Sequence, residues 1–286
     1  MKTTVLLLGA TGYLGGNIAV ALCKAGYDVI CVVRKTSDIS RLKSLDVTLI
    51  SNEPGEIDLI LRTRKIDWII NGVCTYKAND TLYGDILESN IIFPLTVLNL
   101  AVKYGVKNFI TMGTSLPDDI NLYSYTKKKF SEFGQYLSAK DGINFIDLQL
   151  EMFYGGLFEP GNRFISSCRI KMQKGIPLDL TKGTQKRDMI RVEDISAIIC
   201  RLIESNYVSG YKSLPVGSGE QHPIKEVIQY MHDVIGSQSD LNFGAIPSRK
   251  GEPDTIADIS WYDDIGYKLK FSFFEGLKEE CGRIST

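Results

Sequence analysis

The stretch LLLGATGYLGGNIAVAL, residues 6–22, joins an apolar run to an amphipathic segment through glycines spaced three residues apart. Each glycine has a physical task in a strand, turn and helix unit that binds a dinucleotide. Gly9 allows a tight turn, Gly12 allows the backbone to approach a diphosphate, and Gly15 allows close packing of the helix on the strand. The stretch therefore predicts the first βα unit of a dinucleotide-binding fold. The residues of this loop that are predicted to contact the cofactor are Gly9, Thr11, Gly12, Tyr13, Leu14 and Gly15.

The first half of the chain alternates short apolar runs with amphipathic segments, which is the pattern of repeated βα units. Long helices are predicted near residues 83–104 and 124–139, and strands in DVICVV, VTLI, DWIINGV, NFITMG and NFIDLQL. Strands that are joined through helices run parallel. The predicted fold is therefore a Rossmann-like, doubly wound α/β sheet.

After about residue 155 the alternation loosens. A helix is predicted near 164–174, further helices after RVEDIS and PIKEV, and strands in PLDL and KSLPVG. We expect residues 1–154 to form the dinucleotide-binding domain, which also holds the candidate catalytic residues considered below. Residues 155–286 are expected to form a smaller α/β lobe that binds the substrate and is partly interleaved with the sheet.

The composition excludes several classes of partner. With 33 Lys and Arg against 34 Asp and Glu, the net charge is -1. The chain therefore has no excess of positive charge that would attract nucleic acid. The six cysteines lack Cys-x-x-Cys spacing, which favours reduced thiols in a cytoplasmic protein over disulfides or a metal site. No run of about 18 apolar residues occurs, so we expect no membrane span.

The end of the second predicted strand indicates which dinucleotide is preferred. In VVRKTS, Arg34 and Lys35 stand where an NAD-selecting protein usually has Asp or Glu for the ribose 2'-hydroxyl. A guanidinium binds a 2'-phosphate that a carboxylate would repel. We therefore expect NADPH (NADP+) as the cofactor, with Arg34 and Lys35 near its 2'-phosphate.

The stretch NLYSYTKKKF, residues 121–130, contains Tyr-x-x-x-Lys twice, as Tyr123 with Lys127 and as Tyr125 with Lys129. Residues i and i+4 share one face of a helix, so either pair could point into a cleft. A free tyrosine has a pKa near about 10. A neighbouring ammonium is expected to lower this pKa toward neutrality, where the phenol can exchange a proton with a carbonyl oxygen. Spacing alone leaves both pairs open.

The glycine spacing and the Tyr-x-x-Thr-Lys sequence at 123–127 resemble the short-chain dehydrogenase/reductase superfamily in its extended form, the NAD-dependent epimerase/dehydratase family. Because the residue before the lysine is usually Ser or Thr in that family, the resemblance favours Tyr123 and Lys127 as catalytic residues. It implies that Thr114, in NFITMGTS, holds the substrate oxygen, with Ser115 as the alternative. The further cofactor contacts that it implies are Asn71, Val73, Asn90 and Lys127.

Later segments resemble the nucleotide-sugar site of the same family. Arg187 in GTQKRDMIRVEDI, and Arg249 and Glu252 in PSRKGEPDTIADIS, stand where relatives hold the diphosphate and ribose of the substrate. LEMFYGG and KRDMIRVED most resemble nucleotide-sugar 4-ketoreductases of the CDP-paratose/CDP-abequose synthase type. The resemblance implies an NADPH-dependent oxidoreductase that reduces the C4 keto group of a 4-keto-6-deoxy or 3,6-dideoxy sugar. Such sugars enter O-antigen, lipopolysaccharide and other surface polysaccharides.

Other activities of the family are weighed on the same residues. Dehydratases follow the catalytic threonine with Asp-Glu, whereas Thr114 is followed by Ser115 and Leu116. A C4 epimerase retains NAD, which Arg34 disfavours, and a nonenzymatic NADP-binding regulator would usually have lost the tyrosine or the lysine. Both remain alternatives, and the nucleoside base, the C3 substituent and the C4 configuration stay open. The resemblance also implies a homodimer through a four-helix bundle of the helices near 84–104 and 124–139.

Overall fold

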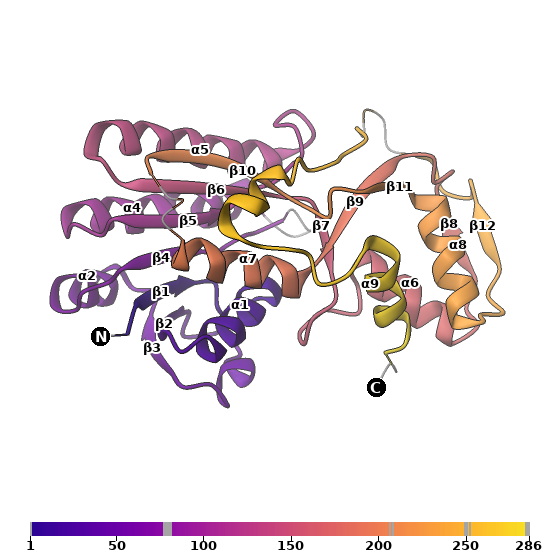
Figure 1. Ribbon diagram of the computed structural model, residues 1–286, viewed down its shortest axis with the longest axis horizontal. Helices are drawn as coiled ribbons and strands as arrows, with labels where there is room; N and C mark the ends of the chain where they lie inside the picture. The colour runs from indigo at the N-terminus through magenta and orange to yellow at the C-terminus, as the bar shows by residue number, and fades with distance from the viewer. Residues whose placement is uncertain are drawn as a thin grey trace.

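The computed structural model describes residues 2–76, 82–205, 207, 209–248, 251 and 253–283. Its main element is a seven-stranded sheet with the strand order β10-β6-β5-β4-β1-β2-β3, in which all neighbouring strands are parallel (Figure 1). The predicted Rossmann-like sheet is confirmed. The order reverses between β1 and β4, where doubly wound folds bind their ligands. The strands are β1 (Thr4–Leu8), β2 (Asp28–Val33), β3 (Val47–Ser51), β4 (Trp68–Asn71), β5 (Asn108–Met112), β6 (Asn144–Leu150) and β10 (Tyr211–Val216).

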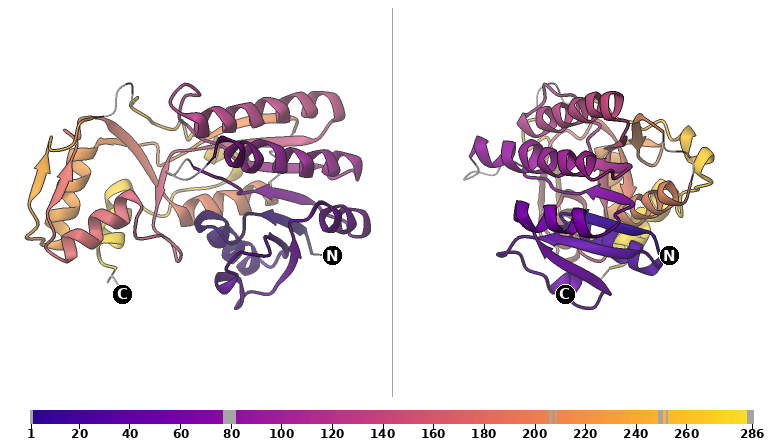
Figure 2. Two further views of the ribbon diagram at one scale, coloured as in Figure 1. Left: turned by 180° about the vertical axis from the view of Figure 1, so that it is seen from behind. Right: turned by 90° about the vertical axis from the view of Figure 1, so that its left-hand side faces the viewer.

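Helices cover both faces of this sheet. α1 and α7 lie on one face, and α2, α4 and α5 lie on the other (Figure 2). A π-helical turn, η2, joins α3 to α4. The helical segments are α1 (Tyr13–Lys24), η1 (Ser40–Leu42), α2 (Pro54–Thr63), α3 (Tyr83–Leu87), η2 (Glu88–Ile92), α4 (Phe93–Lys103), α5 (Leu122–Asp141), α7 (Val192–Glu204) and η3 (Ser260–Ile265).

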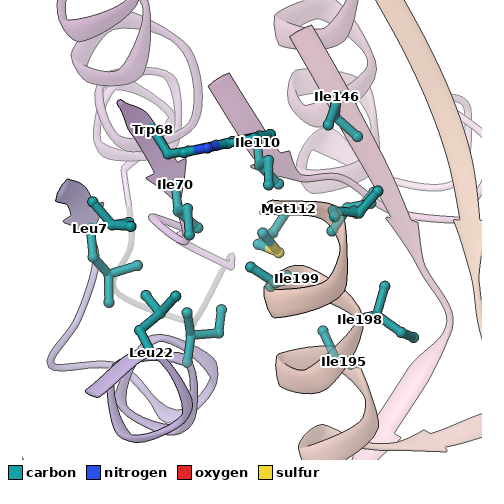
Figure 3. Close-up of a cluster of buried hydrophobic side chains, with 14 of the residues drawn as sticks. Leu7, Leu22, Trp68, Ile70, Ile110, Met112, Ile146, Ile195, Ile198 and Ile199 are labelled. Atoms are coloured by element: carbon teal, nitrogen blue, oxygen red, sulfur yellow. The ribbon is translucent and has the colours of Figure 1, made fainter. Parts of the chain in front are cut away.

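The sheet is buried on both faces, which explains why the sequences of its strands are continuous apolar runs. Every residue of β1 is buried, because its side chains alternate between two covered faces. Each fully buried aliphatic side chain stabilises the fold by about 1.5–3 kcal/mol relative to an exposed one. The cluster between the sheet, α1 and α7 is shown in Figure 3 and includes Leu7, Leu22, Ile70, Ile110, Ile146, Ile195, Ile198 and Ile199.

A smaller lobe with its own apolar cluster lies at the carboxyl end of the sheet (Figure 1). It contains a three-stranded sheet, β11-β9-β7, and a two-stranded sheet, β12-β8. Its elements are β7 (Met152–Tyr154), α6 (Phe164–Gln173), β8 (Leu178–Leu180), β9 (Lys186–Arg191), β11 (Gln221–Pro223), α8 (Ile224–Ile235), β12 (Leu241–Phe243) and α9 (Phe273–Cys281).

Two elements from the second half of the chain lie with the large sheet. β10 pairs with β6 along its whole length, and α7 packs against α1. The indole nitrogen of Trp261 donates to the Pro215 oxygen at 2.8 Å, which ties η3 to β10. The chain therefore passes between the two lobes several times, and the division at residues 154 and 155 stays a prediction.

Within the described residues, one helical span, 83–103, is long and apolar enough to cross a membrane by length and composition alone. This is weak evidence, since core helices of soluble proteins meet the same criterion. Here α4 packs against α2, and η2 packs against α5.

Candidate active site

The glycine loop closes between the ends of β1 and β4. Gly9 has a φ of +79°, which L side chains rarely adopt. A Cβ on Gly9 would lie 2.8 Å from the carbonyl carbon of Gly72, and a Cβ on Gly15 would lie 2.1 Å from the Gly9 oxygen. Backbone therefore packs on backbone here, and only glycine fits at positions 9 and 15.

The start of α1 can bind an anion. Gly12 precedes the helix without a side-chain cap, and the first turn carries no acidic residue. The backbone N–H groups of a first helical turn have no partner within the helix and bind phosphate groups. Two contacts hold the loop in place: Arg41 Nη1 donates to the Thr11 oxygen at 3.2 Å, and the Tyr13 hydroxyl donates to the Gly155 oxygen at 2.6 Å.

A cavity of about 330 Å³, which we call the glycine-loop cavity, extends from this turn past the end of β2. Arg34 lines it, whereas Lys35 pairs with Glu53 at 3.5 Å and its side chain is 77% exposed. The glycine cradle, the uncapped turn and the guanidinium together fit a phosphorylated dinucleotide. The residues of the lining that bear on this fit are Gly9, Thr11, Gly12, Arg34, Ser37, Asn52 and Val73.

A second cavity of about 160 Å³, the tyrosine cavity, adjoins the first, and Gly12, Gly72 and Cys74 line both. Tyr123 and Lys127 line the tyrosine cavity. The remaining lining residues that bear on its chemistry are Tyr13, Leu14, Gly15, Tyr76, Phe153 and Arg163.

The start of α5 determines which residues reach this cavity. Asn121 caps the helix, because its Oδ1 accepts a hydrogen bond from Ser124 N at 2.9 Å. Tyr123 and Lys127 then lie one turn apart on the inward face. Lys127 is only 4% exposed, and its Nζ donates to the Val73 oxygen at 3.0 Å.

The other Tyr-x-x-x-Lys pair lies on the outward face of α5. Tyr125 is 46% exposed. Lys129 Nζ lies 2.7 Å from a Glu132 carboxylate oxygen and 5.4 Å from the centre of the Tyr125 ring. The structure thus brings Tyr123 and Lys127 to the cavity, and Tyr125 and Lys129 to the surface.

Thr114 follows β5 and is buried. Its hydroxyl oxygen accepts a hydrogen bond from Leu116 N at 3.3 Å, and its side chain is near enough to Tyr123 to oppose the rise in the pKa of that phenol. The N–H of Ser115 donates to the Leu150 oxygen at 3.1 Å, and the Ser115 side chain opposes the rise in the pKa of Glu151. Of the two hydroxyl residues considered, Thr114 is the one beside the phenol.

The titration of the pair differs from the expectation. Burial raises the pKa of Tyr123 well above its usual value, Tyr76 and Cys74 add to the rise, and the hydrogen bond with Thr114 opposes it. Burial also lowers the pKa of Lys127. The expected shift of Tyr123 toward neutrality is therefore wrong in direction, because desolvation outweighs the neighbouring ammonium. Tyr123 stays protonated at neutral pH and can donate a proton.

Asn71 and Asn90 are buried behind the cavities and shape the segment after β4. Val73 N donates to Asn71 Oδ1 at 3.2 Å. Asn90, in the π-helical turn η2, accepts from Thr75 N at 2.8 Å and donates to Thr126 Oγ1 at 3.0 Å. Asn90 thus connects this segment to α5, and π-helical turns often occur at functional sites. Direct cofactor contact by either asparagine stays a prediction.

A third cavity, of about 440 Å³, lies in the smaller lobe, and we call it the lobe cavity. Arg187 on β9 lines it and is 5% exposed. Arg187 Nη1 donates to the Pro253 and Lys186 oxygens. The other two predicted substrate contacts, Arg249 and Glu252, lie outside the described residues.

Several residues near the site escaped the sequence analysis. Cys74 and Tyr76 follow β4, and the rule that ligands bind at the carboxyl ends of parallel strands could have located them. Arg163 lines the tyrosine cavity from the loop before α6, which carried no signal in the sequence. Glu151 is buried between Ser115 and Arg187, and burial raises its pKa to about 7. No group of three or more potential metal ligands occurs among the residues that the structure describes.

The chain is similar to known proteins over almost its whole length. CDP-abequose synthase of Salmonella typhimurium (strain LT2) is 28% identical over 304 residues, which cover 99% of this chain and 99% of that protein. CDP-abequose synthase of Salmonella muenchen is 26% identical over 284 residues, with 96% of each chain covered. UDP-glucuronic acid 4-epimerase from Bacillus cereus, solved with UDP-glucuronic acid and NAD, has the same fold, with a TM-score of 0.83, 22% identity and 98% of each chain covered. The family model that describes the NAD dependent epimerase/dehydratase family matches residues 5–212, and the chain belongs to that family.

Proposed function

We propose that the protein is an NADPH-dependent reductase of the C4 keto group of a nucleotide-linked 4-keto-6-deoxy or 3,6-dideoxy sugar. The observation that carries this proposal is the meeting of Tyr123, Lys127 and Thr114 beside the glycine loop. The full-length similarity to two CDP-abequose synthases supports the substrate class. A CDP-linked sugar is accordingly the first substrate to test.

The chemistry needs a proton at the ketone oxygen and a hydride at its carbon. When bound, NADPH supplies the hydride. Tyr123 donates its proton to the C4 oxygen, and its raised pKa keeps that proton available at neutral pH. Thr114 donates a hydrogen bond to the same oxygen, and Lys127 contributes positive charge where negative charge develops.

The preference for NADPH rests on Arg34. Arg34 and Ser37 both line the glycine-loop cavity, and a guanidinium and a hydroxyl are groups that bind a 2'-phosphate. Lys35 would contribute only long-range charge, since its side chain faces solvent. This arrangement disfavours the runner-up activity, an epimerase that retains NAD.

The nucleoside diphosphate is assigned to the smaller lobe. Arg187 supplies a guanidinium at the wall of the lobe cavity, which a diphosphate would neutralise. Arg249 and Glu252 are retained as proposed contacts to the diphosphate and the ribose. The apolar part of the lining, which includes Phe164 and Leu178, suits the flat face of a base.

We further propose a cytoplasmic homodimer that serves surface-polysaccharide synthesis. The apolar residues Ile92, Phe133 and Tyr136 are 51%, 44% and 62% exposed on η2 and α5. Two copies that pair these helices into a four-helix bundle would bury them. Sedimentation of the purified protein, with a Phe133→Lys variant for comparison, tests the bundle: a wild-type monomer contradicts it.

The decisive experiment offers purified protein a panel of 4-keto-6-deoxy sugars linked to CDP, dTDP, GDP and UDP. We expect stoichiometric NADPH oxidation with one of them, with NADH as the matched control, and a C4 alcohol whose configuration NMR reports. Interconversion of C4 epimers without net NADPH consumption would identify an epimerase instead. Binding of NADPH without turnover of any sugar would favour a regulator.

A further inference from the structure

A carboxylate is buried in the large sheet beneath the middle of α5. Asp147 lies on β6 between the apolar residues Ile146 and Leu148, and it is 1% exposed. A carboxylate in such surroundings costs free energy unless hydrogen bonds and nearby positive charge offset the cost. The mechanism proposed above gives Asp147 no role.

Hydrogen-bond donors surround one oxygen of this carboxylate. Ser131 Oγ, on α5, donates to Asp147 Oδ2 at 2.7 Å, and Gln149 Nε2 donates to the same oxygen at 3.3 Å. The Tyr211 hydroxyl, on β10, lies 2.8 Å from Ser131 Oγ and can donate to it. Asp147 Oδ1 is buried without a hydrogen-bond partner among the described residues. Because a protonated carboxyl would need an acceptor for its proton, these contacts fit the ionised form.

The other oxygen of Asp147 lies against the end of β5. A Cβ on Gly113 would come within 2.0 Å of Asp147 Oδ1, so only glycine leaves room for the carboxylate. Gly113 directly precedes Thr114 and lines the tyrosine cavity. Asp147 therefore lies directly behind the wall of the candidate site.

These contacts place Asp147 close to Lys127. Ser131 follows Lys127 by one helical turn on the inward face of α5, so their Cβ atoms lie about 5–6 Å apart. Ser131 contacts Asp147 from one side. Gly113, which lines the tyrosine cavity together with Lys127, contacts it from the other. The two charges interact through the protein interior, where the dielectric is low and salt screens little.

Among the described residues, the other titratable side chains that face Lys127 from this cavity are neutral at neutral pH. Burial raises the pKa of Tyr123, of Tyr76 and of Cys74. Burial lowers the pKa of Lys127, and Cys74 and Asp147 oppose that fall. Because the thiol keeps its proton at neutral pH, Asp147 is the group that supplies negative charge there.

Two further cations lie near the site. Burial lowers the pKa of Lys128, the next residue on α5, and the charge of Asp147 opposes this fall as well. Arg163 lines the tyrosine cavity from the loop before α6. Positive neighbours favour the neutral form of Lys127, and the carboxylate of Asp147 counters them. Burial raises the pKa of Asp147 itself, while its hydrogen-bond donors and the two lysines oppose that rise.

We propose that Asp147 is a positioning residue of this site, whose carboxylate keeps the Lys127 ammonium charged. Its contacts with Ser131 and Gly113 also hold α5 against the strand end that precedes Thr114. The proposal rests on the reductase function inferred above, because the charge of Lys127 matters there while negative charge develops on the C4 oxygen.

Asp147→Asn tests the proposal because it keeps the shape of the side chain and removes its charge. We expect the alkaline limb of the kcat/KM profile to move to lower pH by about one pH unit, the effect of losing an opposite charge nearby. Asp147→Val continues the apolar sequence of β6, removes the same charge and should move the limb in the same direction. A limb that stays in place in either variant would overturn the proposal.

Matched variants separate the charge of Asp147 from its packing. Ser131→Ala removes a hydrogen bond and keeps the charge, so any loss of rate should be equal at every pH. Asp141→Asn removes a carboxylate from the exposed end of α5 and should leave the profile unchanged. In a Lys127→Arg background, Asp147→Asn should no longer move the limb. If Ser131→Ala moves the limb as far as Asp147→Asn does, Asp147 acts by packing only and the proposal is wrong.

A titration without substrate keeps this proposal distinguishable from the reductase function. In protein labelled with carbon-13 at lysine Cε, the Lys127 signal is identified by its loss in Lys127→Arg. Its titration midpoint should lie about one pH unit lower in Asp147→Asn than in the wild type, and Asp141→Asn should leave it unchanged. An unmoved midpoint in Asp147→Asn would overturn the proposal. A moved midpoint in a protein that reduces none of the sugars would leave the charge pair intact and refute the reductase function alone.

Discussion

The inward and outward faces of α5 carry the same Tyr-x-x-x-Lys spacing in opposite surroundings. On the inward face, burial lowers the pKa of Lys127. On the outward face, the hydrogen bond with Glu132 raises the pKa of Lys129. Two residues along a helix correspond to about 200° of rotation, so the two pairs cannot face the same cleft. Spacing makes a pair possible, and the helix start at Asn121 decides which pair reaches the cavity.

The largest expected effect comes from removing the inward phenol. Tyr123→Phe should lower kcat by roughly 10²–10⁴-fold, the usual contribution of a general acid, because in the proposed mechanism Tyr123 gives the proton to the C4 oxygen and Thr114 only hydrogen-bonds to it. NADPH affinity should stay near wild type, since the hydroxyl and not the ring is lost. Steady-state kinetics with the active 4-keto sugar and fluorescence titration with NADPH measure the two quantities.

Tyr125→Phe is the control for the outward face and should retain full activity. A reversal, with Tyr125→Phe inactive and Tyr123→Phe active, would refute the assignment of the faces and with it the proposed site.

Two adjacent basic residues after β2 show the same contrast between a side chain at a cavity and one at the surface. Arg34 lines the glycine-loop cavity and Lys35 pairs with Glu53. Arg34→Asp should weaken NADPH relative to NADH by about 10- to 100-fold, because a charge-assisted bond worth about 1.5–3 kcal/mol is replaced by repulsion. Lys35→Asp should change this preference far less. Dissociation constants for both dinucleotides decide the matter, and an unchanged ratio in Arg34→Asp would refute the proposed NADPH preference.

The large sheet could be predicted from the sequence because its strands are buried on both faces and its βα units are local. Residues 6–22 alone combine an apolar strand, a glycine turn and a helix. The interleaving was only partly predicted, since the pairing of β10 with β6 joins segments that no local pattern connects. The pairing of strands that lie far apart in the chain is hard to predict from a single sequence.

The residues of the candidate site also fall into those that local spacing predicts and those that it does not. Gly9, Tyr123 and Lys127 belong to spacings that a single helix or turn imposes, so they could be found by pattern. Tyr76 and Arg163 reach the tyrosine cavity from irregular segments, where no period links a residue to a position in space. The direction of the Tyr123 pKa shift also escaped prediction, because it depends on how deeply the hydroxyl is buried.

Packing of α5 on the sheet gives a stability test of the two faces. Gly134 lies on the inward face, and a Cβ there would come within 2.3 Å of the Phe145 ring, which is fully buried. Gly134→Ala should lower the free energy of unfolding by about 1–3 kcal/mol through overpacking, which outweighs the better helix propensity of alanine.

Gln135→Ala, one position along on the exposed surface, should change stability by less than about 0.5 kcal/mol. Urea denaturation of both variants measures the difference. A Gly134→Ala protein that is as stable as wild type would show that the inward face is looser than the structure indicates.

The smallest expected effect is a shift in pH dependence. Burial lowers the pKa of Lys127, while burial raises that of Tyr123 well above its usual value. As pH rises, Lys127 therefore loses its proton first, and the reductase rate should fall through the Lys127 pKa, below the usual lysine value of about 10.4.

The Lys127→Arg variant keeps its positive charge to higher pH, so the alkaline limb of its kcat/KM profile should move to higher pH even if the maximum rate falls. Lys129→Arg should leave the limb in place, because Lys129 interacts with Glu132 at the surface. If the limb stays fixed in Lys127→Arg as well, the group that titrates is not Lys127, and the role of its charge in the reaction would have to be given to another residue.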